Sequence, residues 1–411
     1  MPMTPIPQID IKDYDYSLSE ERIAKYPLSQ RDQCKLLCYK KGETEDRTFG
    51  SLPQLLPPSS FLVRNNTRVI KARLHFFRST GASIEIFCLE PASPSIYEEN
   101  LTATGACSWV CLIGNARRWK ETTLSTTVQL KDGTTTELRA QRSPLYSDRV
   151  DFSWDNHNIS FGILLEALGE LPIPPYLKRK TSETDLLDYQ TVYAHKLGSV
   201  AAPTAGLHFT EDSLKNLLTQ GHSISDITLH VGAGTFLPVK TELVNDHIMH
   251  KEFCTVSTTT VEALLKAQGK PIIPIGTTSV RTLESLFWLA SQMVNPTQVK
   301  ENSDKLPHID QWIPYTSFYT DLSREEALHT ILSYLQKEKM EELNFTTSLI
   351  IIPGYRYRMI DGLITNFHQP QSTLLLLIAA LIGQDWRKVY TYALENEYRF
   401  LSYGDACLLL P

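Results

Sequence analysis

The sequence predicts an α/β main domain into which a small all-β barrel domain is inserted. From about residue 156 onward, apolar runs ending in turn residues alternate with amphipathic, helix-like segments, which is the pattern of an α/β core. Between residues 76 and 155, short β-rich runs alternate with turn signals, which is typical of a small barrel. We therefore predict a discontinuous main domain, residues 1–75 and 156–411, and an inserted domain, residues 76–155.

The composition is that of an ordinary globular protein with reduced thiols. Of 411 residues, 42% are apolar and 21% charged, and the seven cysteines are scattered and odd in number. No basic-then-apolar signal opens the chain, and the longest apolar run, Leu374–Ile382, is too short to span a bilayer. We expect a cytoplasmic monomer. Because the net charge is −6, binding to RNA has to come from a local basic patch.

Near the N-terminus, Ser17 or Ser19 is expected to cap a short helix that stops at Pro27. Residues 61–80 then form a basic strand–turn–strand segment with Asn65 and Asn66 in the turn. Five cations and no acid occur in it: Arg64, Arg68, Lys71, Arg73 and Arg78. Such a patch suits a phosphate or another anion, and a solvated basic hairpin is the alternative.

Short strands are expected throughout the inserted domain, with a hairpin turn at KDGT, residues 131–134. Arg117, Arg118 and Lys120 give this domain a second basic spot. In the main domain, helical periodicity and capping residues predict helices in the following ranges: 159–171, 210–221, 258–269, 277–290, 323–340, 372–383 and 385–398. Strands are expected at 35–41, 223–231 and 271–275, and two more on either side of a PGYRY loop at 353–357.

Residues 201–252 are the densest in groups that can carry protons. This stretch contains His208, His230, His247 and His250, and Asp246 directly precedes His247. Histidine titrates near neutrality, so His247 oriented by an acid is a candidate acid or base, with a hydrogen-bonded structural role as the alternative. The spacing offers too few ligands for a metal, and we predict none.

Three turns are placed where a ligand can approach the backbone. HVGAGTF, residues 230–236, lacks the third glycine and opening helix of a dinucleotide site, so we expect a tight turn there, functional or purely structural. Thr277, Thr278 and Ser279 follow a buried strand and open a helix, whose free N–H groups suit an anion. His368 lies in a loop just before another helix. Neither a serine-hydrolase elbow nor a P-loop occurs.

Eight motifs in order carry a family resemblance: VRNNTRVIKARL, AAPTAGLHFT, TLHVGAGTFLPV, DHIMHKE, IPIGTTSVRTLES, IPGYRY, LITNFHQPQSTLLLL and YRFLSYGDA. Together they resemble the S-adenosylmethionine:tRNA ribosyltransferase-isomerases of queuosine biosynthesis, from about Tyr14 to Ala406. Two features depart from the family pattern. Lys71 stands where a proline is usual, and the segment 291–345 is longer than is typical.

The resemblance implies a reaction as well as a fold. The ribosyl part of S-adenosylmethionine would be transferred and isomerised onto 7-aminomethyl-7-deazaguanine at the tRNA wobble position, giving epoxyqueuosine-tRNA, adenine and methionine, without a metal. A sulfonium acidifies the neighbouring C5′–H, the departing adenine needs a proton, and the methionine carboxylate needs a cation or a helix N-terminus. A methyltransferase using the same cofactor is the first alternative, and a non-catalytic RNA-binding protein is the second.

The matching motifs supply the expected site residues. Proton transfer is assigned to a group of histidines with one acid, without a choice of a single base: His208, His230, His247, His250, His368 and Asp246. Arg68, Arg73 and Arg281 are expected to pair with carboxylate or phosphate, and Tyr355 or Phe367 to stack on a base. The remaining cofactor- or substrate-binding positions are Asn65, Asn66, Thr67, Thr204, Gly206, Gly232, Gly234, Thr235, Thr277, Thr278, Ser279, Asn366, Ser372, Thr373 and Tyr403.

Overall fold

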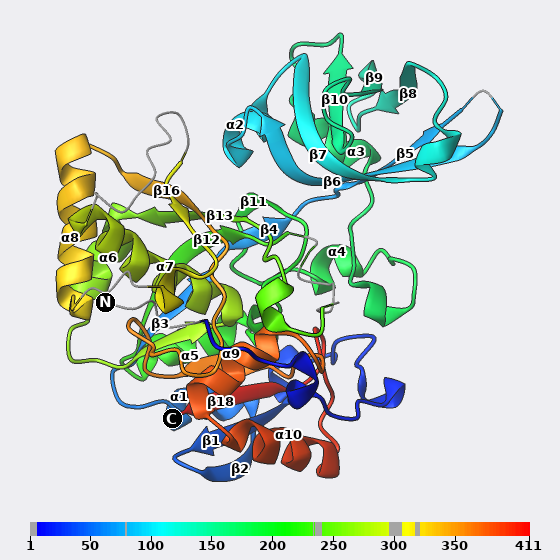
Figure 1. Cartoon of the computed structure of the whole chain (residues 1–411). Coiled ribbons are helices and arrows are strands. Elements are labelled where there is room, and N and C mark those ends of the chain that lie inside the picture. The colour runs from blue at the N-terminus through cyan, green and yellow to red at the C-terminus, as the bar shows by residue number, and fades with distance from the viewer. Residues whose placement is uncertain (1–5, 79, 233, 235–240, 296–305, 317–320) are drawn as a thin grey trace. The chain divides into compact units, whose positions relative to one another are not determined.

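The chain divides into two compact units in a computed structural model (Figure 1). Residues 6–78, 80–232, 234, 241–295, 306–316 and 321–411 are described. Unit 1 comprises residues 1–66, 191–194 and 203–411, and unit 2 comprises residues 67–190 and 195–202. Unit 2 contains the range 76–155 and extends beyond it on both sides.

Ten strands of the described part of unit 1 form one large sheet in the order β15-β16-β13-β12-β3-β14-β17-β18-β1-β2. They are β1 Lys35–Lys40, β2 Glu43–Thr48, β3 Phe61–Asn65, β12 Ser223–His230, β13 Glu252–Ser257, β14 Ile272–Ile275, β15 His308–Ile309, β16 Glu342–Thr347, β17 Leu363–Asn366 and β18 Ala406–Leu410. The central strands β12, β3, β14 and β17 are parallel, whereas β13 is antiparallel to β12 and β18 is antiparallel to β17. The buried centre is most apolar in β14, whose four residues Ile272–Ile275 are all buried.

The helices of unit 1 begin where the sequence offers a cap. Thr210 and Ser323 each form a capping box, and Ser372 accepts a hydrogen bond from the Leu375 amide. The helices are α1 Leu52–Leu55, α5 Glu211–Thr219, α6 Thr258–Lys266, α7 Thr277–Val294, α8 Arg324–Glu338, α9 Thr373–Ile382 and α10 Asp385–Glu395. Short 3-10 helices in this unit are η1 Ile11–Tyr14, η2 Glu20–Arg22, η3 Arg31–Gln33, η4 Phe49–Ser51, η7 Thr204–His208, η9 Val244–Asp246 and η11 Ile313–Tyr315.

An apolar core fixes one face of the large sheet. Alternate strand residues such as Leu62, Ile273 and Ile364 are fully buried there against residues of α1, α5 and η7. Phe209 at the end of η7 is also fully buried in this cluster. Burial of each such side chain contributes about 1.5–3 kcal/mol, so the position of η7 beside the sheet is strongly determined.

Unit 2 contains a six-stranded antiparallel sheet in the order β5-β6-β7-β10-β9-β8, whose outer strands β5 and β8 approach each other. Its strands are β5 Arg73–Phe77, β6 Ser83–Ser93, β7 Ala106–Gly114, β8 Thr123–Gln129, β9 Thr135–Arg142 and β10 Arg149–Trp154. A parallel pair, β4 Thr67–Val69 and β11 Lys196–Ser199, lies outside it. The helices of unit 2 are α2 Tyr97–Thr102, η5 Ala116–Arg118, α3 Phe161–Leu168, η6 Pro175–Leu177 and α4 Asp185–Asp188.

The mixed α/β class is confirmed, and two local predictions are wrong. Near Ser19 only the 3-10 turn Glu20–Arg22 forms, with no side-chain cap, so the predicted longer helix is absent there. The strand before the PGYRY loop ends at Thr347, and the apolar run 349–352 is buried without being a strand. Apolar composition alone does not distinguish a buried strand from a buried irregular segment. No helix in the described ranges has the length and apolar character needed to cross a membrane.

Candidate active site

Four predicted motifs meet at one edge of the large sheet. Strands β12, β3, β14 and β17 are neighbours and run parallel, so their carboxyl ends lie together. His230, Asn65 and Asn366 are the last residues of three of these strands, and Gly276 directly follows β14. Ligands of open α/β sheets bind at the carboxyl ends of the strands. This edge therefore contains the candidate active site.

Asn65 and Asn66 join the ends of β3 and β12. The Asn65 side-chain amide donates to the Leu229 carbonyl at 2.9 Å and accepts from the Leu229 amide at 3.1 Å. Asn66 Oδ1 accepts from the Thr228 hydroxyl at 2.8 Å. Both asparagines are buried, so these contacts shape the edge of the sheet at the site.

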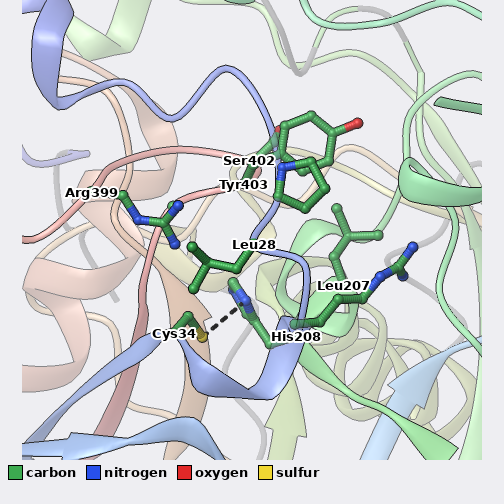
Figure 2. A pocket seen from close by; sticks show the side chains of 10 residues that line it. Leu28, Cys34, Leu207, His208, Arg399, Ser402 and Tyr403 are labelled. Carbon is green, nitrogen blue, oxygen red and sulfur yellow. Dashed lines mark hydrogen bonds between the residues drawn. The ribbon is translucent and has the colours of Figure 1, made fainter. Parts of the chain in front are cut away.

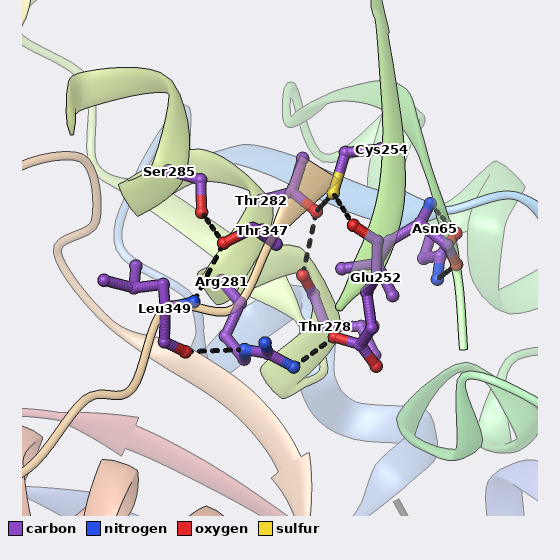
Figure 3. Close-up of polar contacts among 10 residues, drawn as sticks. Asn65, Glu252, Cys254, Thr278, Arg281, Thr282, Ser285, Thr347 and Leu349 are labelled. Carbon is purple, nitrogen blue, oxygen red and sulfur yellow. Dashed lines mark hydrogen bonds and ion pairs between the residues drawn. The ribbon is translucent and has the colours of Figure 1, made fainter. Parts of the chain in front are cut away.

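Glu252 and Arg281 form a buried ion pair at this edge (Figure 3). Glu252 begins β13 beside the end of β12, and Arg281 lies in the second turn of α7; they are only 4% and 7% exposed. Arg281 Nε donates to the Leu349 carbonyl at 3.1 Å, whereas Nη2 is buried without a hydrogen-bond partner among the described residues. Burial raises the pKa of Glu252, and Arg281 and the Gly232 amide oppose that rise.

The N-terminus of α7 adds unused donors beside this pair. Its cap residue, Gly276, has φ +86° and offers no side chain to the first turn. Within the described chain, the N–H groups of Thr277, Thr278 and Ser279 donate to no acceptor, and Thr278 Oγ1 is also buried without a partner. Ser279 Oγ donates to the Ile275 carbonyl at 2.8 Å. Free N–H groups, the helix dipole and a guanidinium are the features that favour binding of a carboxylate.

The TAGLH turn is shaped by packing within unit 1. A Cβ atom at Gly206 would lie 2.0 Å from the Tyr193 hydroxyl oxygen and 2.7 Å from Thr191 Cγ2. The turn also lies next to the α7 cap, because a Cβ at Gly276 would come within 3.5 Å of the Ala205 Cβ. Contact with Tyr193 thus accounts for the glycine at 206, and Thr204 begins this turn.

His208 is enclosed between the side chains of Cys34 and Asn366, and Figure 2 shows its contact with Cys34. Its Nδ1 lies 3.3 Å from Cys34 Sγ, and its Nε2 lies 3.0 Å from Asn366 Nδ2, which also donates to the Leu401 carbonyl. Asn366 therefore presents its N–H to Nε2, which leaves the ring proton on Nδ1 facing the thiol. Burial lowers the pKa of His208 to about 4. Both ring nitrogens of His208 are therefore engaged within the protein.

A small pocket adjoins His208 and Tyr403 (Figure 2). Its lining consists of Pro27, Leu28, Arg31, Cys34, Leu207, His208, Arg399, Ser402, Tyr403 and Gly404. The space is about 10 Å³, which suits a water molecule and not a nucleoside. Tyr403 is therefore near His208, and both line this small pocket.

His368 and Phe367 lie in the protein interior. Both ring nitrogens of His368 have a neighbour at 3.4 Å, Thr365 Oγ1 and the Tyr390 hydroxyl, and burial lowers its pKa to about 4. Phe367 is 1% exposed and packs against Phe400, with ring centroids 4.9 Å apart. A nucleic-acid base has no access to a ring in this position.

The DHIMHKE segment is the most open of the histidine-bearing motifs. His247 is half-buried, His250 and Asp246 are exposed, and Asp246 makes no side-chain hydrogen bond within the described part. Among the described residues, Asp246 therefore does not orient His247 through a hydrogen bond, and another acid is left as the alternative. Burial and then the neighbouring His250 lower the pKa of His247. His250 lies against Gly234, where a Cβ would be 1.9 Å from its ring.

Buried His230 lies one strand away from this segment. Its ring centroid is 5.9 Å from that of Phe253. The histidines of the 201–252 stretch therefore divide into an open pair, His247 and His250, and two buried members, His208 and His230.

The remaining predicted positions have varied settings. Tyr355 donates to Glu284 at 2.7 Å and accepts from Trp288 Nε1 at 3.0 Å, so its hydroxyl is engaged in the interior. Ser372 caps α9 and Thr373 begins it. Thr67, Arg68 and Arg73 belong to unit 2, where Arg73 pairs with Glu85 at 2.8 Å and Arg68 is exposed. Thr235 lies outside the described residues.

Comparisons with known proteins decide the family. Residues 11–409 match the family model described as queuosine biosynthesis protein. The chain belongs to this family. Its relatives include S-adenosylmethionine:tRNA ribosyltransferase-isomerases from Treponema denticola, 35% identical, and Halothermothrix orenii, 36% identical, each covering 97% of this chain and 99% of the relative. A crystal structure of an S-adenosylmethionine tRNA ribosyltransferase from Thermotoga maritima is 26% identical over 97% of this chain and 100% of that chain, with a TM-score of 0.46.

Three residues of this family member were not identified from the sequence. Glu252 could have been identified from the sequence, because it is the first residue of the apolar run EFCTV. A carboxylate in that position is expected to be buried and therefore to need a partner. Glu284 is fully buried inside α7, accepts from Tyr355 and from the amides of residues 358 and 359, and burial raises its pKa to about 7. Cys34 gave no signal, since its contact with His208 joins segments far apart in the chain.

Proposed function

We propose that this chain transfers and isomerises the ribosyl moiety of S-adenosylmethionine onto 7-aminomethyl-7-deazaguanine at the wobble position of tRNA. Adenine and methionine leave, and epoxyqueuosine-tRNA is the product. Family membership and the names of the relatives support this activity. The observation that supports it from the chain itself is the Glu252–Arg281 pair beside an uncapped helix, with donors unused on both.

The methionine part of the substrate carries both charges that this site can accommodate. Its carboxylate would bind the Arg281 Nη2 group and the N–H groups of Thr277, Thr278 and Ser279. The Glu252 carboxylate, held by Arg281 and the Gly232 amide, would face the α-ammonium or the sulfonium of the same molecule. Each of the two buried charges would thereby gain a second opposite charge when substrate binds, which offsets part of the cost of burying them.

Proton transfer is assigned to the DHIMHKE segment. Loss of adenine breaks the bond at C1′, and loss of methionine breaks the bond between C5′ and sulfur, so a base and an acid are both required. His247 and His250 are the accessible histidines, and the lowered pKa of His247 keeps it neutral at pH 7 and able to accept the C5′ proton. His208 and His368 would serve as positioning residues, because their rings are enclosed.

The sheet of unit 2 is proposed to be the inserted β-barrel domain of this enzyme, and tRNA its macromolecular partner. No cluster of three or more His, Cys, Asp or Glu side chains suited to a metal occurs in the described residues. The metal-free reaction, the monomeric state and the cytoplasmic location stay predictions.

Product analysis tests the activity directly. Purified chain, S-adenosylmethionine and tRNA carrying the aminomethyl-deazaguanine are expected to yield adenine, methionine and a tRNA nucleoside heavier by the added cyclic group, all measured by mass spectrometry. tRNA with guanine at the wobble position is the control and is expected to release no adenine. Formation of S-adenosylhomocysteine in place of adenine would indicate a methyltransferase instead. If neither adenine nor S-adenosylhomocysteine were formed, the proposed activity would be contradicted.

A further inference from the structure

One end of the six-stranded sheet in unit 2 is basic and the other is acidic. By the register of the antiparallel pairs, the ends of β5, β7 and β9 and the starts of β6, β8 and β10 lie at the same end, here called end A. Its described loop residues carry Arg78, Arg117, Arg118 and Lys120 against Glu121 and Asp148. The segments at the opposite end carry Glu98, Glu99, Asp132 and Asp155 against Lys71 and Lys131.

The cations of end A are largely unused within the protein. Arg78 pairs with Glu121 at 2.6 Å, but Arg117, Arg118 and Lys120 are exposed and form no ion pair with any described residue. At the acidic end, by contrast, Asp155 pairs with Arg139 of β9 at 2.5 Å. Exposed cations without acidic partners create a positive potential that is available to an external polyanion.

Exposed apolar side chains gather at the same end. Leu145 is 82% exposed, Phe77 64%, Leu112 57% and Tyr146 51%. Arg149 lies over the exposed ring of Tyr146 at 4.2 Å, and Arg142 lies 6.0 Å from the ring of Trp119, which is buried. Exposed aromatic rings interleaved with arginines are the combination that stacks on bases while it holds phosphates.

We infer that end A binds the RNA backbone of the tRNA substrate, with Arg117, Arg118 and Lys120 on phosphates and Tyr146 against a base. This inference rests on the proposed function for the identity of the RNA. The whole chain has a net charge of −6, so a concentrated basic surface is required for RNA to bind at all. A partner protein would be matched less well, because three neighbouring cations that form no ion pair within the described residues need a partner that is uniformly negative there.

Matched charge reversals test the surface in the full-length chain. Lys120→Glu at end A is compared with Lys131→Glu at the acidic end, since both replace an exposed lysine in the same unit. Binding of tRNA, measured by fluorescence anisotropy, is expected to weaken about 5–10-fold for Lys120→Glu and to change less than about twofold for Lys131→Glu. Arg117→Gln/Arg118→Gln, which removes charge without reversing it, is expected to lower the slope of log Kd against log salt by about two.

Activity readouts separate this inference from the proposed function. At saturating tRNA, the end A variants should keep kcat for adenine release within about twofold and raise only KM for tRNA. Equal Kd values and salt slopes for the Lys120 and Lys131 variants would overturn the RNA surface, even with adenine release intact. If the end A variants changed the molecular mass of the protein in solution without changing its binding to tRNA, the inferred RNA surface would also be overturned. That result would indicate a protein-binding surface instead. If the wild-type chain bound tRNA through end A but released no adenine, the proposed activity would fail while this surface remained.

Discussion

Two polar clusters lie at the same edge of the large sheet, and they differ in which atoms are left unused. In the α7 cluster, formed by Glu252, Arg281 and Thr278, the buried atoms without a partner in the described residues include the donor Arg281 Nη2. In the His208 cluster, formed by Cys34, His208 and Asn366, both ring nitrogens are engaged and the unpartnered atom is the acceptor Asn366 Oδ1. Unused donors beside a helix N-terminus favour an anionic ligand, whereas an enclosed histidine favours a structural role.

Replacing Arg281 should have the largest effect. Arg281→Met leaves the Glu252 carboxylate buried without its cation, which costs about 3–5 kcal/mol of the free energy of unfolding. Adenine release should fall by more than about a hundredfold, because the proposed carboxylate site loses its guanidinium. Urea unfolding and a kinetic assay at saturating S-adenosylmethionine measure the two effects separately.

The double variant Glu252→Gln/Arg281→Met is the control for that result. It removes both charges, so most of the lost stability should return while activity stays low. If the double variant regained wild-type adenine release, the α7 cluster would be structural, and the contrast with the His208 cluster would disappear.

Replacing the accessible histidines should have the second-largest effect on activity. His247→Ala and His250→Ala remove groups that can reach a substrate, and at least one should lower kcat by about 10²–10⁴-fold with little effect on stability. His208→Gln is the comparison, because glutamine can still accept from Asn366 but cannot titrate. It should lower stability more than kcat, and the reverse ranking would move the proton-transfer role to the His208 cluster.

Acid should destabilise the chain through its enclosed histidines. His208 and His368 both have a pKa of about 4 in the folded chain, against about 6.5 when unfolded. Between these values the unfolded chain binds the extra proton, so the free energy of unfolding falls as pH drops from about 6.5 to about 4. Each histidine contributes on the order of 3 kcal/mol to this loss.

Unfolding at pH 7.5 and at pH 5 measures this dependence. His208→Gln should be less stable than the wild type at pH 7.5 by about 1 kcal/mol, and its free energy of unfolding should fall less between the two pH values than that of the wild type. Glu284, whose pKa burial raises to about 7, acts in the opposite direction in both proteins and does not affect this difference. An equal fall in the two proteins would mean that His208 is not held in its neutral form.

Replacing Thr278 should have the smallest effect on stability and activity. Thr278→Val keeps the shape of the side chain and removes a hydroxyl oxygen that has no described partner, so the free energy of unfolding should change by less than about 1 kcal/mol. KM for S-adenosylmethionine should rise about 3–10-fold if this hydroxyl contacts the substrate. Thr282→Val, one turn along α7, is the matched variant. It loses a hydrogen bond to the Thr278 carbonyl and should leave KM unchanged.

Local rules were enough to predict most elements of secondary structure. Helical periodicity with caps at Thr210, Ser323 and Ser372 placed three helices, and glycine turns after apolar runs placed the motifs at strand ends. Such local rules could not predict ion pairs between residues far apart in the sequence. Arg281 was assigned to a ligand without Glu252, which lies 29 residues away in the chain, because no local pattern specifies a buried partner.

The burial of individual side chains was also not predictable from the sequence. Phe367 and Tyr355 were expected to stack on a base, yet both lie in the interior, one in an aromatic cluster and one bonded to Glu284. An aromatic residue in a loop has the same sequence signature whether its ring points inward or outward. The accessibility of a side chain depends on which segments cover the loop, and that is determined by the tertiary fold.

Because Cys34 contacts His208 in the interior, chemical modification of Cys34 can report local unfolding of the segment around η7. Burial raises the pKa of the Cys34 thiol, so the thiolate that reacts with alkylating agents is scarce while the fold is closed. Half-buried Cys38, on the neighbouring strand β1, is more accessible to the same reagent. The rate at which Cys34 is alkylated relative to Cys38 therefore measures how often the segment around η7 separates from the sheet, and a substrate that stabilises the closed fold should slow that rate.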